Sequence, residues 1–351
     1  MDAVVWVKTR SMKYSFYNDY AEGVHPKVLE ALQASNLSQE TGYGEDSFTK
    51  AAAELIRGAI GNPGADVHFV SGGTQANLIV LSSMLRSFES VIAVESGHIN
   101  VHEGGALEAT GHKINTVPGV HGKLVPRAIE EVCTRHDNEQ MVMPRAVYIS
   151  NSTELGTVYT KEELRALSRT CKNLGLYFYL DGARLGSALT SKDSDITLAE
   201  LSSFVDVFYI GGTKNGALLG EAIVINNPDL QKDFRYHLKQ RGALLAKGRA
   251  ISLQFRALFT DDLYFELARH ANRMAALLAN AITTSGYTFL TPPSTNQLFP
   301  ILPNTVIESL QEDYGFYVWE KGENTSSIRL VTSWATSEEA VKVFITKLKN
   351  S

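Results

Sequence analysis

The amino-acid sequence predicts an α/β protein with a large, doubly wound domain followed by a smaller α+β domain. Three observations support this prediction. Short apolar runs alternate with helical stretches from Ala51 to Ile225, these runs lack strict polar–apolar alternation, and the pattern changes after about residue 250. Strands that are apolar on both faces are typical of a mostly parallel sheet covered by helices on each side.

The predicted sheet is built from short runs rich in β-branched and aromatic residues, namely Val67–Val70, Ser90–Val94, Ala146–Ser150, Leu176–Leu180, Val205–Ile210 and Ala222–Ile225. One helix between these strands has clear end signals. Thr160 can cap it, Glu163 completes a capping box, and Gly175 stops it. We expect its buried stripe to consist of Leu164, Leu167, Cys171 and Leu174.

We divide the chain into a large domain over residues 14–250, with an N-terminal arm over residues 1–50, and a small domain over residues 251–351. Residues 252–285 are expected to be largely helical and to lead out of the large domain. The elements expected after them are a strand Gln297–Leu302, a helix Ile307–Tyr314, a strand Ile328–Thr332 and a terminal helix capped by Ser337.

The bulk composition indicates the class of partner. With 44% apolar and 20% charged residues and a net charge of −5, the chain is an ordinary globular protein without a basic field. We therefore expect a small-molecule substrate, no nucleic acid and no membrane. Two cysteines, Cys133 and Cys171, favour a reducing compartment, which makes the cytoplasm the default location. The segment before Met12 is either a start-site extension or a short presequence.

The most informative residues are Lys214, which stands in Gly211-Gly212-Thr213-Lys214-Asn215-Gly216, and Asp181, which ends an apolar strand. An ammonium group beside a buried strand is costly to desolvate unless it is paired or neutralised. A lysine that forms an imine with an aldehyde cofactor avoids this cost, and an aspartate can pair with the cofactor's pyridine nitrogen. The two residues therefore predict a pyridoxal 5'-phosphate site. We predict no metal ligands.

Two further motifs follow predicted strands. Ser71-Gly72-Gly73-Thr74-Gln75-Ala76-Asn77 opens a helix predicted over Gln75–Arg86, and a glycine-rich helix start can bind phosphate. The alternative is a simple strand-to-helix turn. His98 lies just past another strand, where it can stack on a cofactor ring and act as acid or base. A purely structural histidine is the alternative.

Two arginines complete the candidate site. Arg184 follows Asp181 closely and can bind cofactor or substrate oxygens, or it can form an ion pair with Asp181 instead. Arg329, within a predicted strand, can grip a substrate carboxylate or lie on a solvated strand face.

These motifs together resemble the threonine aldolases of the β-eliminating-lyase/threonine-aldolase branch of fold-type I, aspartate-aminotransferase-like pyridoxal-phosphate enzymes. The resemblance runs from about Phe16 to Thr332. It is carried by Thr41-Gly42-Tyr43-Gly44-Glu45-Asp46, Ser71–Asn77, Gly97-His98-Ile99 with Glu103-Gly104-Gly105, Leu180-Asp181-Gly182-Ala183-Arg184-Leu185, Thr213-Lys214 and Ile328-Arg329-Leu330-Val331-Thr332.

The resemblance implies a role for each matching residue. Lys214 would form the Schiff base, Gly73 and Thr74 would hold the phosphate, His98 would stack on the ring, and Asp181 would pair with the ring nitrogen. The substrate side would be formed by Asn18, Arg184, Arg329 and Tyr43. Tyr43 would reach the active site of a neighbouring subunit in a homodimer or homotetramer.

The sequence departs from the family pattern at three places. Asn18-Asp19 stands where many members have Ser-Asp. Ser150-Asn151-Ser152-Thr153-Glu154 replaces Glu-Asn-Thr-His, so a second active-site histidine is missing. The basic loop that contacts the phosphate in the family is altered around Gly242–Arg249, where Lys247 or Arg249 would replace the family arginine.

The implied reaction is retro-aldol cleavage of L-threonine, L-allo-threonine or a related β-hydroxy-α-amino acid to glycine and an aldehyde. The alternatives are β-elimination or transamination on the same fold and, more remotely, a pyridoxal-phosphate-binding protein without catalytic activity.

Overall fold

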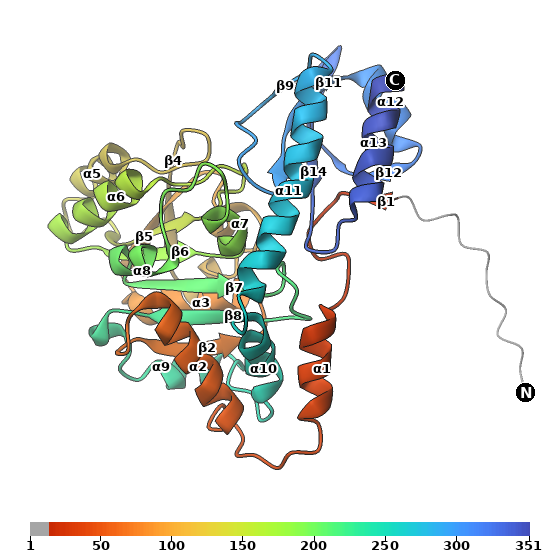
Figure 1. The fold of residues 1–351 in the computed structure, drawn as a ribbon. Helices are drawn as coiled ribbons and strands as arrows, with labels where there is room; N and C mark the ends of the chain where they lie inside the picture. The colour runs from red at the N-terminus through yellow and green to blue at the C-terminus, as the bar shows by residue number, and fades with distance from the viewer. Residues whose placement is uncertain (1–13) are drawn as a thin grey trace, which may run out of the picture.

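The computed structural model describes residues 14–351, so the alternatives for the segment before Met12 lie outside the described residues. Its central sheet has the strand order β2-β8-β7-β6-β5-β3-β4 and carries helices on both faces (Figure 1). The strands are β2 Asp66–Val70, β3 Glu89–Val94, β4 Lys113–Val117, β5 Met143–Ser150, β6 Tyr177–Asp181, β7 Val207–Gly211 and β8 Glu221–Ile225.

The predicted α/β class is confirmed, and the predicted runs all lie within or beside strands of this sheet. Only β8 runs against its neighbours, because it pairs antiparallel with both β2 and β7. The sequence did not predict β4, which forms one edge and pairs with β3 alone. Its pattern of exposed and buried residues is that of an edge strand rather than a buried apolar run.

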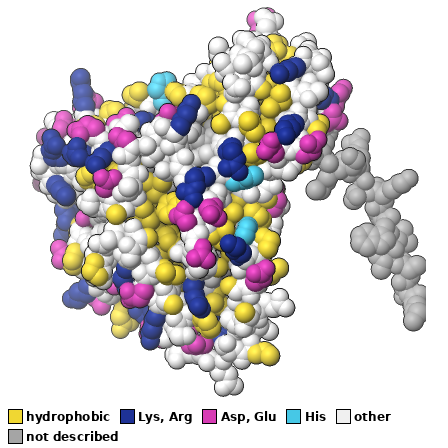
Figure 2. Space-filling model, viewed as in Figure 1, with side chains coloured by type: hydrophobic (Ala, Val, Ile, Leu, Met, Phe, Trp, Pro, Cys, Tyr) yellow, Lys and Arg dark blue, Asp and Glu magenta, His cyan; other side chains and the backbone are white. Residues whose placement is uncertain are grey.

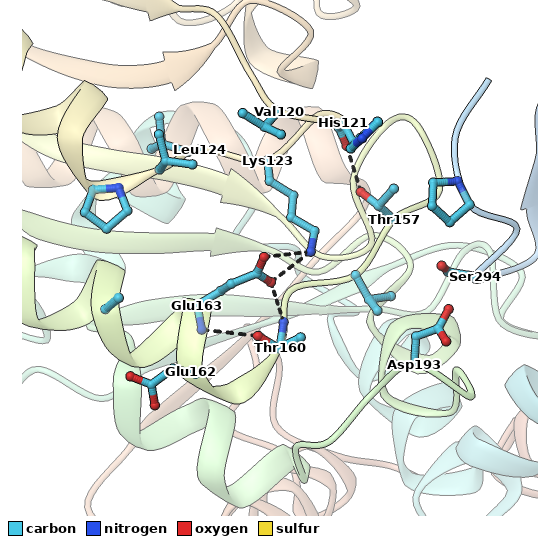
Figure 3. A pocket seen from close by; sticks show the side chains of 15 residues that line it. Val120, His121, Lys123, Leu124, Thr157, Thr160, Glu162, Glu163, Asp193 and Ser294 are labelled. Carbon is cyan, nitrogen blue, oxygen red and sulfur yellow. Dashed lines mark hydrogen bonds and ion pairs between the residues drawn. The ribbon is translucent and has the colours of Figure 1, made fainter.

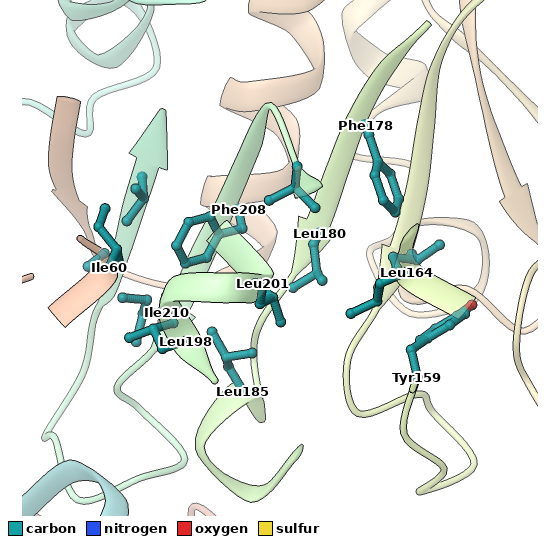
Figure 4. Close-up of a cluster of buried hydrophobic side chains, with 14 of the residues drawn as sticks. Ile60, Tyr159, Leu164, Phe178, Leu180, Leu185, Leu198, Leu201, Phe208 and Ile210 are labelled. Carbon is teal, nitrogen blue, oxygen red and sulfur yellow. The ribbon is translucent and has the colours of Figure 1, made fainter. Parts of the chain in front are cut away.

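Two apolar layers cover the sheet, as the lack of alternation in its strands predicts. In β6 and β7, the side chains of Phe178, Leu180, Phe208 and Ile210 point to one layer (Figure 4). Tyr179 and Val207 belong to the other layer. Every second residue of a strand faces the same side, so both faces are buried.

Helices form these layers. One layer contains α2 Ser47–Ile60, α5 Pro126–Arg135, α6 Lys161–Asn173, α7 Leu185–Leu189, α8 Leu198–Phe204, α10 Arg249–Leu258 and the start of α11 Leu263–Thr284. The other contains α3 Gly73–Met84, α4 His98–Val101 and α9 Phe234–Gln240. Helix α1 Pro26–Ala34 adds Val28 to the first layer, and the remaining elements of this part of the chain are the short 3₁₀ helices Glu108–Thr110 and Pro228–Leu230.

A second lobe follows, into which the long helix α11 extends (Figure 1). Its sheet is antiparallel: β14 pairs with β10, β11 and β13, and β11 also pairs with β9. The elements are β9 Thr288–Phe289, β10 Gln297–Leu298, β11 Pro300–Pro303, α12 Asn304–Gln311, β12 Tyr314–Gly315, β13 Tyr317–Glu320, β14 Thr325–Val331 and α13 Glu338–Asn350.

The N-terminal segment contacts both lobes. Strand β1 Tyr14–Ser15 pairs in parallel with β12, and Phe16 packs in the apolar cluster of the second lobe. Further along, the backbone N–H of His25 donates to the carbonyl of Gly216 in the lysine loop. The division at residue 250 remains a prediction.

One local prediction, the burial of Leu174, was wrong. The helix capped by Thr160 has the full capping box, but Leu174 is its C-cap and is 41% exposed, because the helix ends before it can point inward. The stretch 252–285 is largely helical, as expected, with one break between α10 and α11. There Asp261 and Asp262 adopt φ values of 53° and 59°, in the left-handed region that interrupts a helix.

Charges of both signs are interspersed on the visible face of the molecule, and no basic field covers it (Figure 2). Within residues 14–351, no helix combines the length and apolarity needed to cross a bilayer.

The carboxyl ends of β6 and β7 approach so closely that glycine is required there. A Cβ on Gly182 would lie 1.9 Å from the carbonyl oxygen of Tyr209, and the N–H of Gly211 donates to the carbonyl of Gly182 over 2.9 Å. Both strands are hydrogen-bonded in the sheet, so this backbone cannot retreat. The two chain segments that bear Asp181 and Lys214 are therefore held against each other.

We predict that Gly182→Ala lowers the free energy of unfolding by at least about 3 kcal/mol, because the new methyl group overlaps backbone atoms. Gly23→Ala is the matched control, since no atom lies within 4 Å of its added Cβ. Urea unfolding followed by tryptophan fluorescence measures both. If Gly182→Ala and Gly23→Ala had the same free energy of unfolding, β6 and β7 could not lie as close together as described.

Candidate active site

The predicted site residues converge at the carboxyl edge of the central sheet. Asp181 is the last residue of β6, and Lys214 follows the end of β7 by three positions. His98 opens α4 after β3, and Gly73 opens α3 after β2. In open α/β sheets this edge is where ligands bind.

Asp181 is the most heavily hydrogen-bonded side chain of the site. Its Oδ1 accepts from the Tyr209 hydroxyl (2.5 Å) and the Ala183 N–H (3.0 Å). Its Oδ2 accepts from the Tyr148 hydroxyl (2.7 Å) and the Asn77 amide (3.0 Å). Burial alone would raise the pKa of Asp181, but the positive charge that His98 carries when protonated, together with these hydrogen bonds, lowers the pKa. A buried negative charge is thereby maintained.

Three tyrosines around Asp181 are protonated and act as hydrogen-bond donors. Burial, and next the charge of Asp181, raise the pKa values of Tyr148, Tyr179 and Tyr209 well above their ordinary value. Each tyrosine stands two residues before the last residue of its strand. The parallel register places Tyr148 beside Tyr179, so the phenols form one layer beneath the sheet edge.

His98 is held by an acidic partner. Its Nδ1 lies 2.8 Å from Glu103 Oε1 and, against a carboxylate, acts as the donor. The Asn77 amide donates to the same oxygen (2.6 Å) and also to Asp181, while the Tyr179 hydroxyl donates to Asn77. A neutral His98 in this tautomer keeps Nε2 as an acceptor. The side chain is 34% exposed, so this acceptor is accessible.

The amine of Lys214 has no hydrogen-bond or ion-pair partner among residues 14–351. Burial, and next the charge of Arg184, lower the pKa of Lys214, while Asp19, Asp181 and Glu221 oppose the shift. A partly buried lysine with a lowered pKa is a nucleophile and needs a partner that the folded chain does not itself supply.

The start of α3 offers an anion site. Gly72 and Gly73 bring bare backbone to the first turn, and no side chain caps it. A Cβ on Gly73 would lie 2.9 Å from the Tyr209 hydroxyl, so any side chain there would intrude on the tyrosine layer. Free N–H groups and the helix dipole at such a start favour a phosphate.

Arg184 is paired with Asp19 and not with Asp181. Its Nε and Nη2 donate to the two Asp19 oxygens over 2.7 and 3.0 Å, and Asn296 donates to Asp19 as well (2.9 Å). This fork links the N-terminal segment, the loop after β6 and the start of the second lobe. The side chains are only 12% and 1% exposed.

Arg329 on β14 is not fully satisfied by the protein. Its Nη2 donates to Gln297 (2.6 Å), and its guanidinium lies 5.9 Å from the Trp319 ring centre. Its Nε is buried and has no hydrogen-bond partner among the described residues. Burial, and next the charge of Arg184, lower the pKa of Arg329 to about 10. An anion would satisfy this group.

Other predicted residues do not contact this cluster. Asn18 accepts the N–H of Tyr20 in a turn beside Asp19. Tyr43 is 46% exposed and lies under the Lys239 ammonium, which is 4.8 Å from its ring centre. Arg249 donates to the Ser38 carbonyl. The roles of Asn18 and Tyr43, and the choice between Lys247 and Arg249, remain predictions.

Sequence reasoning assigned no role to Asn77, Glu103, Tyr148, Glu154 or Tyr209. Glu154 accepts the His98 N–H (2.9 Å) and the Ser150 hydroxyl (2.6 Å), and so supports His98 from the segment where the family's second histidine is missing. The available signals were the places of Asn77 and Glu103 in the motifs that carry the resemblance, and the recurring tyrosine two residues before a strand end.

A cavity of about 600 Å³ lies apart from this cluster (Figure 3). Apolar side chains such as Val120 and Leu124 line it, together with the Lys123–Glu163 ion pair of 2.8 Å. None of the predicted site residues lines it, so its chemistry does not match that of the sheet edge.

Comparison with known proteins places this arrangement among relatives. The β-eliminating lyase family matches residues 19–304. The chain is 35% identical to the low specificity L-threonine aldolase of Pseudomonas aeruginosa, over 93% of this chain and 94% of that protein. It superposes on the threonine aldolase of Leishmania major with a TM-score of 0.95 and 49% identity, covering 96% and 99% of the chains.

An aspartate aminotransferase of Thermus thermophilus also superposes, with a TM-score of 0.71, 16% identity, and coverage of 96% of this chain and 91% of that one. This likeness confirms the predicted aspartate-aminotransferase-like fold.

We predict that Asp19→Asn lowers the free energy of unfolding by about 3–5 kcal/mol at neutral pH, because the buried Arg184 charge loses its partner. Glu338→Gln, which breaks an exposed pair with Lys342, is the control and should change the unfolding midpoint little. Urea titration measures both.

The same pair gives a pH dependence. Burial alone would raise the pKa of Asp19, but the charges of Arg184 and Lys214 lower it below its unfolded value. Its stabilisation is therefore present above the unfolded pKa and is lost as the pH falls through the folded pKa. Asp19→Asn should lack this acid-dependent loss. The measurement is the free energy of unfolding of both proteins as the pH is lowered. If the difference between them stays constant, Asp19 does not have a lowered pKa in the folded protein.

Proposed function

Because the chain belongs to the β-eliminating lyase family, we propose that it is a pyridoxal-phosphate-dependent aldolase. Its substrates are L-threonine, L-allo-threonine or related β-hydroxy-α-amino acids, and its products are glycine and an aldehyde. The observation that carries this proposal is the unpartnered amine of Lys214 near the ionised Asp181. The likeness to threonine aldolases supports the choice of reaction.

The residues present fit pyridoxal phosphate. Lys214 offers a free amine of lowered pKa to the aldehyde group. Gly73 and Thr74 offer the anion site, His98 the ring face, and Arg184 further donors. All the acceptor positions of Asp181 already receive protein donors, so a ring nitrogen would share an oxygen with one of them. The buried negative charge favours a protonated ring nitrogen even so.

Pyridoxal phosphate, when bound, supplies a sink for the electron pair left on Cα when the Cα–Cβ bond breaks. The chain's own residues supply orientation and proton transfer. Arg329 holds the substrate carboxylate, because its buried Nε lacks an acceptor in the protein. His98 Nε2 accepts the β-hydroxyl proton, and Glu103 keeps the ring in the tautomer that allows this.

The proposed cleavage accounts for every proton and electron pair. The β-hydroxyl loses its proton, its oxygen forms the carbonyl of the aldehyde, and the pair from the Cα–Cβ bond remains on Cα. Cα then takes up a proton, and the product glycine is released.

The assembly is proposed as a cytoplasmic homodimer or homotetramer with shared active sites. Tyr43 supports this, since it is exposed and held at φ 59° on a loop fixed by Arg235, and it contacts none of the site residues of its own chain.

The rival reactions on the same fold differ in their products. A β-eliminating lyase releases a keto acid and ammonia, and an aminotransferase needs a second keto acid. A pyridoxal-phosphate-binding protein without catalysis releases nothing, and the retained Lys214 argues against it.

The function is tested by offering L-threonine, L-allo-threonine and phenylserine to purified protein with pyridoxal phosphate. We expect aldehyde and glycine in equal amounts from at least one substrate. Lys214→Ala should lose at least about 10³-fold of this turnover, because it lacks the amine that acts as nucleophile. Release of keto acid and ammonia without aldehyde would refute the aldolase proposal and would indicate a β-eliminating lyase instead.

We further predict that Arg329→Lys raises KM for the amino acid by about tenfold or more and lowers kcat less, because a lysine cannot form the bidentate contact. Arg269→Lys, on an exposed arginine paired with Asp262, is the matched control and should leave both constants unchanged. Steady-state kinetics on the best substrate of the panel decides. An unchanged KM would show that Arg329 does not bind the carboxylate.

A further inference from the structure

Glu221 is a buried carboxylate that none of the roles above uses. It is the first residue of β8 and is only 5% exposed. Because β8 runs antiparallel to β7, its first residue pairs with Gly211, the last residue of β7. Glu221 therefore lies at the same edge of the sheet as Asp181 and directly beside the turn that leads to Lys214.

Both oxygens of Glu221 bind that turn. Oε2 accepts the N–H of Gly212 over 2.9 Å, and Oε1 accepts the hydroxyl of Thr213 over 2.9 Å. The Thr213 hydroxyl oxygen in turn accepts the N–H of Gly220 (2.9 Å). On the other side, Phe255 would contact a Cβ on Gly212 at 2.8 Å. The backbone from which the lysine side chain departs is thus held between a carboxylate and an aromatic ring.

The charges around Lys214 explain what an acid at position 221 contributes. Asp19 and Arg184 neutralise each other, which leaves Lys214 with Asp181 and Glu221. Asp181 receives four donors, whereas Glu221 receives two. Of the two acids, Glu221 therefore has the less strongly stabilised negative charge. Burial, opposed by the Thr213 hydrogen bond, raises the pKa of Glu221 to about 7.

We infer that Glu221 is a positioning residue for Lys214: it fixes the turn before the lysine and, when ionised, supplies a negative charge that favours the protonated lysine amine. The inference rests on the proposed role of Lys214. No ion pair joins the two side chains in residues 14–351, so the charge acts through space. The other titratable or charged groups that act on one of the two are Asp19, His102, Tyr179, Asp181, Arg184, Tyr209 and Tyr264.

Two substitutions separate the two parts of this role. Glu221→Gln can keep both contacts, because its carbonyl accepts the Gly212 N–H while its amide donates to the Thr213 oxygen, and only the charge is lost. Glu221→Ala removes the charge and leaves both donors only the Gly220 carbonyl, which lies 3.0 Å from the Gly212 nitrogen and 3.5 Å from the Thr213 hydroxyl. Glu89→Gln is the matched control, since Glu89 is a buried acid at the start of another strand of the sheet, paired with Arg86.

The test uses the cofactor-free protein. Competitive labelling with trace acetic anhydride across pH, read by mass spectrometry of the peptide that contains Lys214, reports the neutral fraction of its amine. Glu221→Gln should move the labelling midpoint to lower pH and raise labelling at pH 8, where wild-type Glu221 is ionised, by at least about threefold, since a stabilising negative charge is gone. Glu89→Gln should match the wild type. Circular dichroism verifies that each variant is folded.

A second readout is the affinity for pyridoxal phosphate, measured by its absorbance. Glu221→Ala should weaken it by about tenfold or more, and Glu221→Gln should weaken it less, because only the alanine variant releases the turn.

The possible results distinguish the two proposals. An unmoved midpoint in Glu221→Gln, with wild-type Lys214 still labelled and protected by pyridoxal phosphate, would overturn the role of Glu221 alone. A wild-type Lys214 that pyridoxal phosphate does not protect would instead refute the proposed function and with it this inference.

Discussion

The constraint on which this site depends is the burial of an ionised carboxylate at the end of β6. A charge there is tolerated only because four donors converge on it, and those donors come from α3, β5, β7 and the backbone after Asp181 itself. The tyrosine layer, the orientation of Asn77 and, through Asn77 and Glu103, the ring of His98 all follow from this requirement. Removing the carboxylate would leave several buried polar groups without partners at once.

The close approach of β6 and β7 serves the same constraint. Bare backbone at Gly182 and Gly211 lets the two strand ends lie closer than side chains would allow, which brings the lysine loop within reach of the buried charge. The Asp19–Arg184 fork then balances a second pair of charges at the junction with the other lobe. Each charge of the site is costly to bury alone, but the positive and negative charges together nearly cancel. Burial lowers the pKa of Lys214 and raises that of Glu221, and the charge of each group opposes the shift of the other.

The fold could be predicted from the sequence because its signals are local. Apolar runs identified the strands, and the capping box at Thr160 identified a helix start. The edge strand β4 was missed because its half-exposed pattern differs from that of the buried strands, and Leu174 was misplaced because one glycine fixes a helix end only to within a residue or two. The chemical residues that carry motifs were also predicted. Their partners were not, because Tyr148 and Glu221 meet the site through strand register and Glu103 reaches His98 from a loop, where no periodic pattern marks the contact.

The reversed direction of β8 has a consequence for how this site can be altered. The amine of Lys214 and the carboxylate of Glu221 are carried by a single hairpin whose two ends are fixed by sheet hydrogen bonds. An insertion or deletion inside this hairpin would shift one group against the other, whereas substitutions elsewhere leave their relative place intact. The length of the segment from Gly211 to Glu221 is therefore fixed by the need to keep the lysine and its countercharge in register.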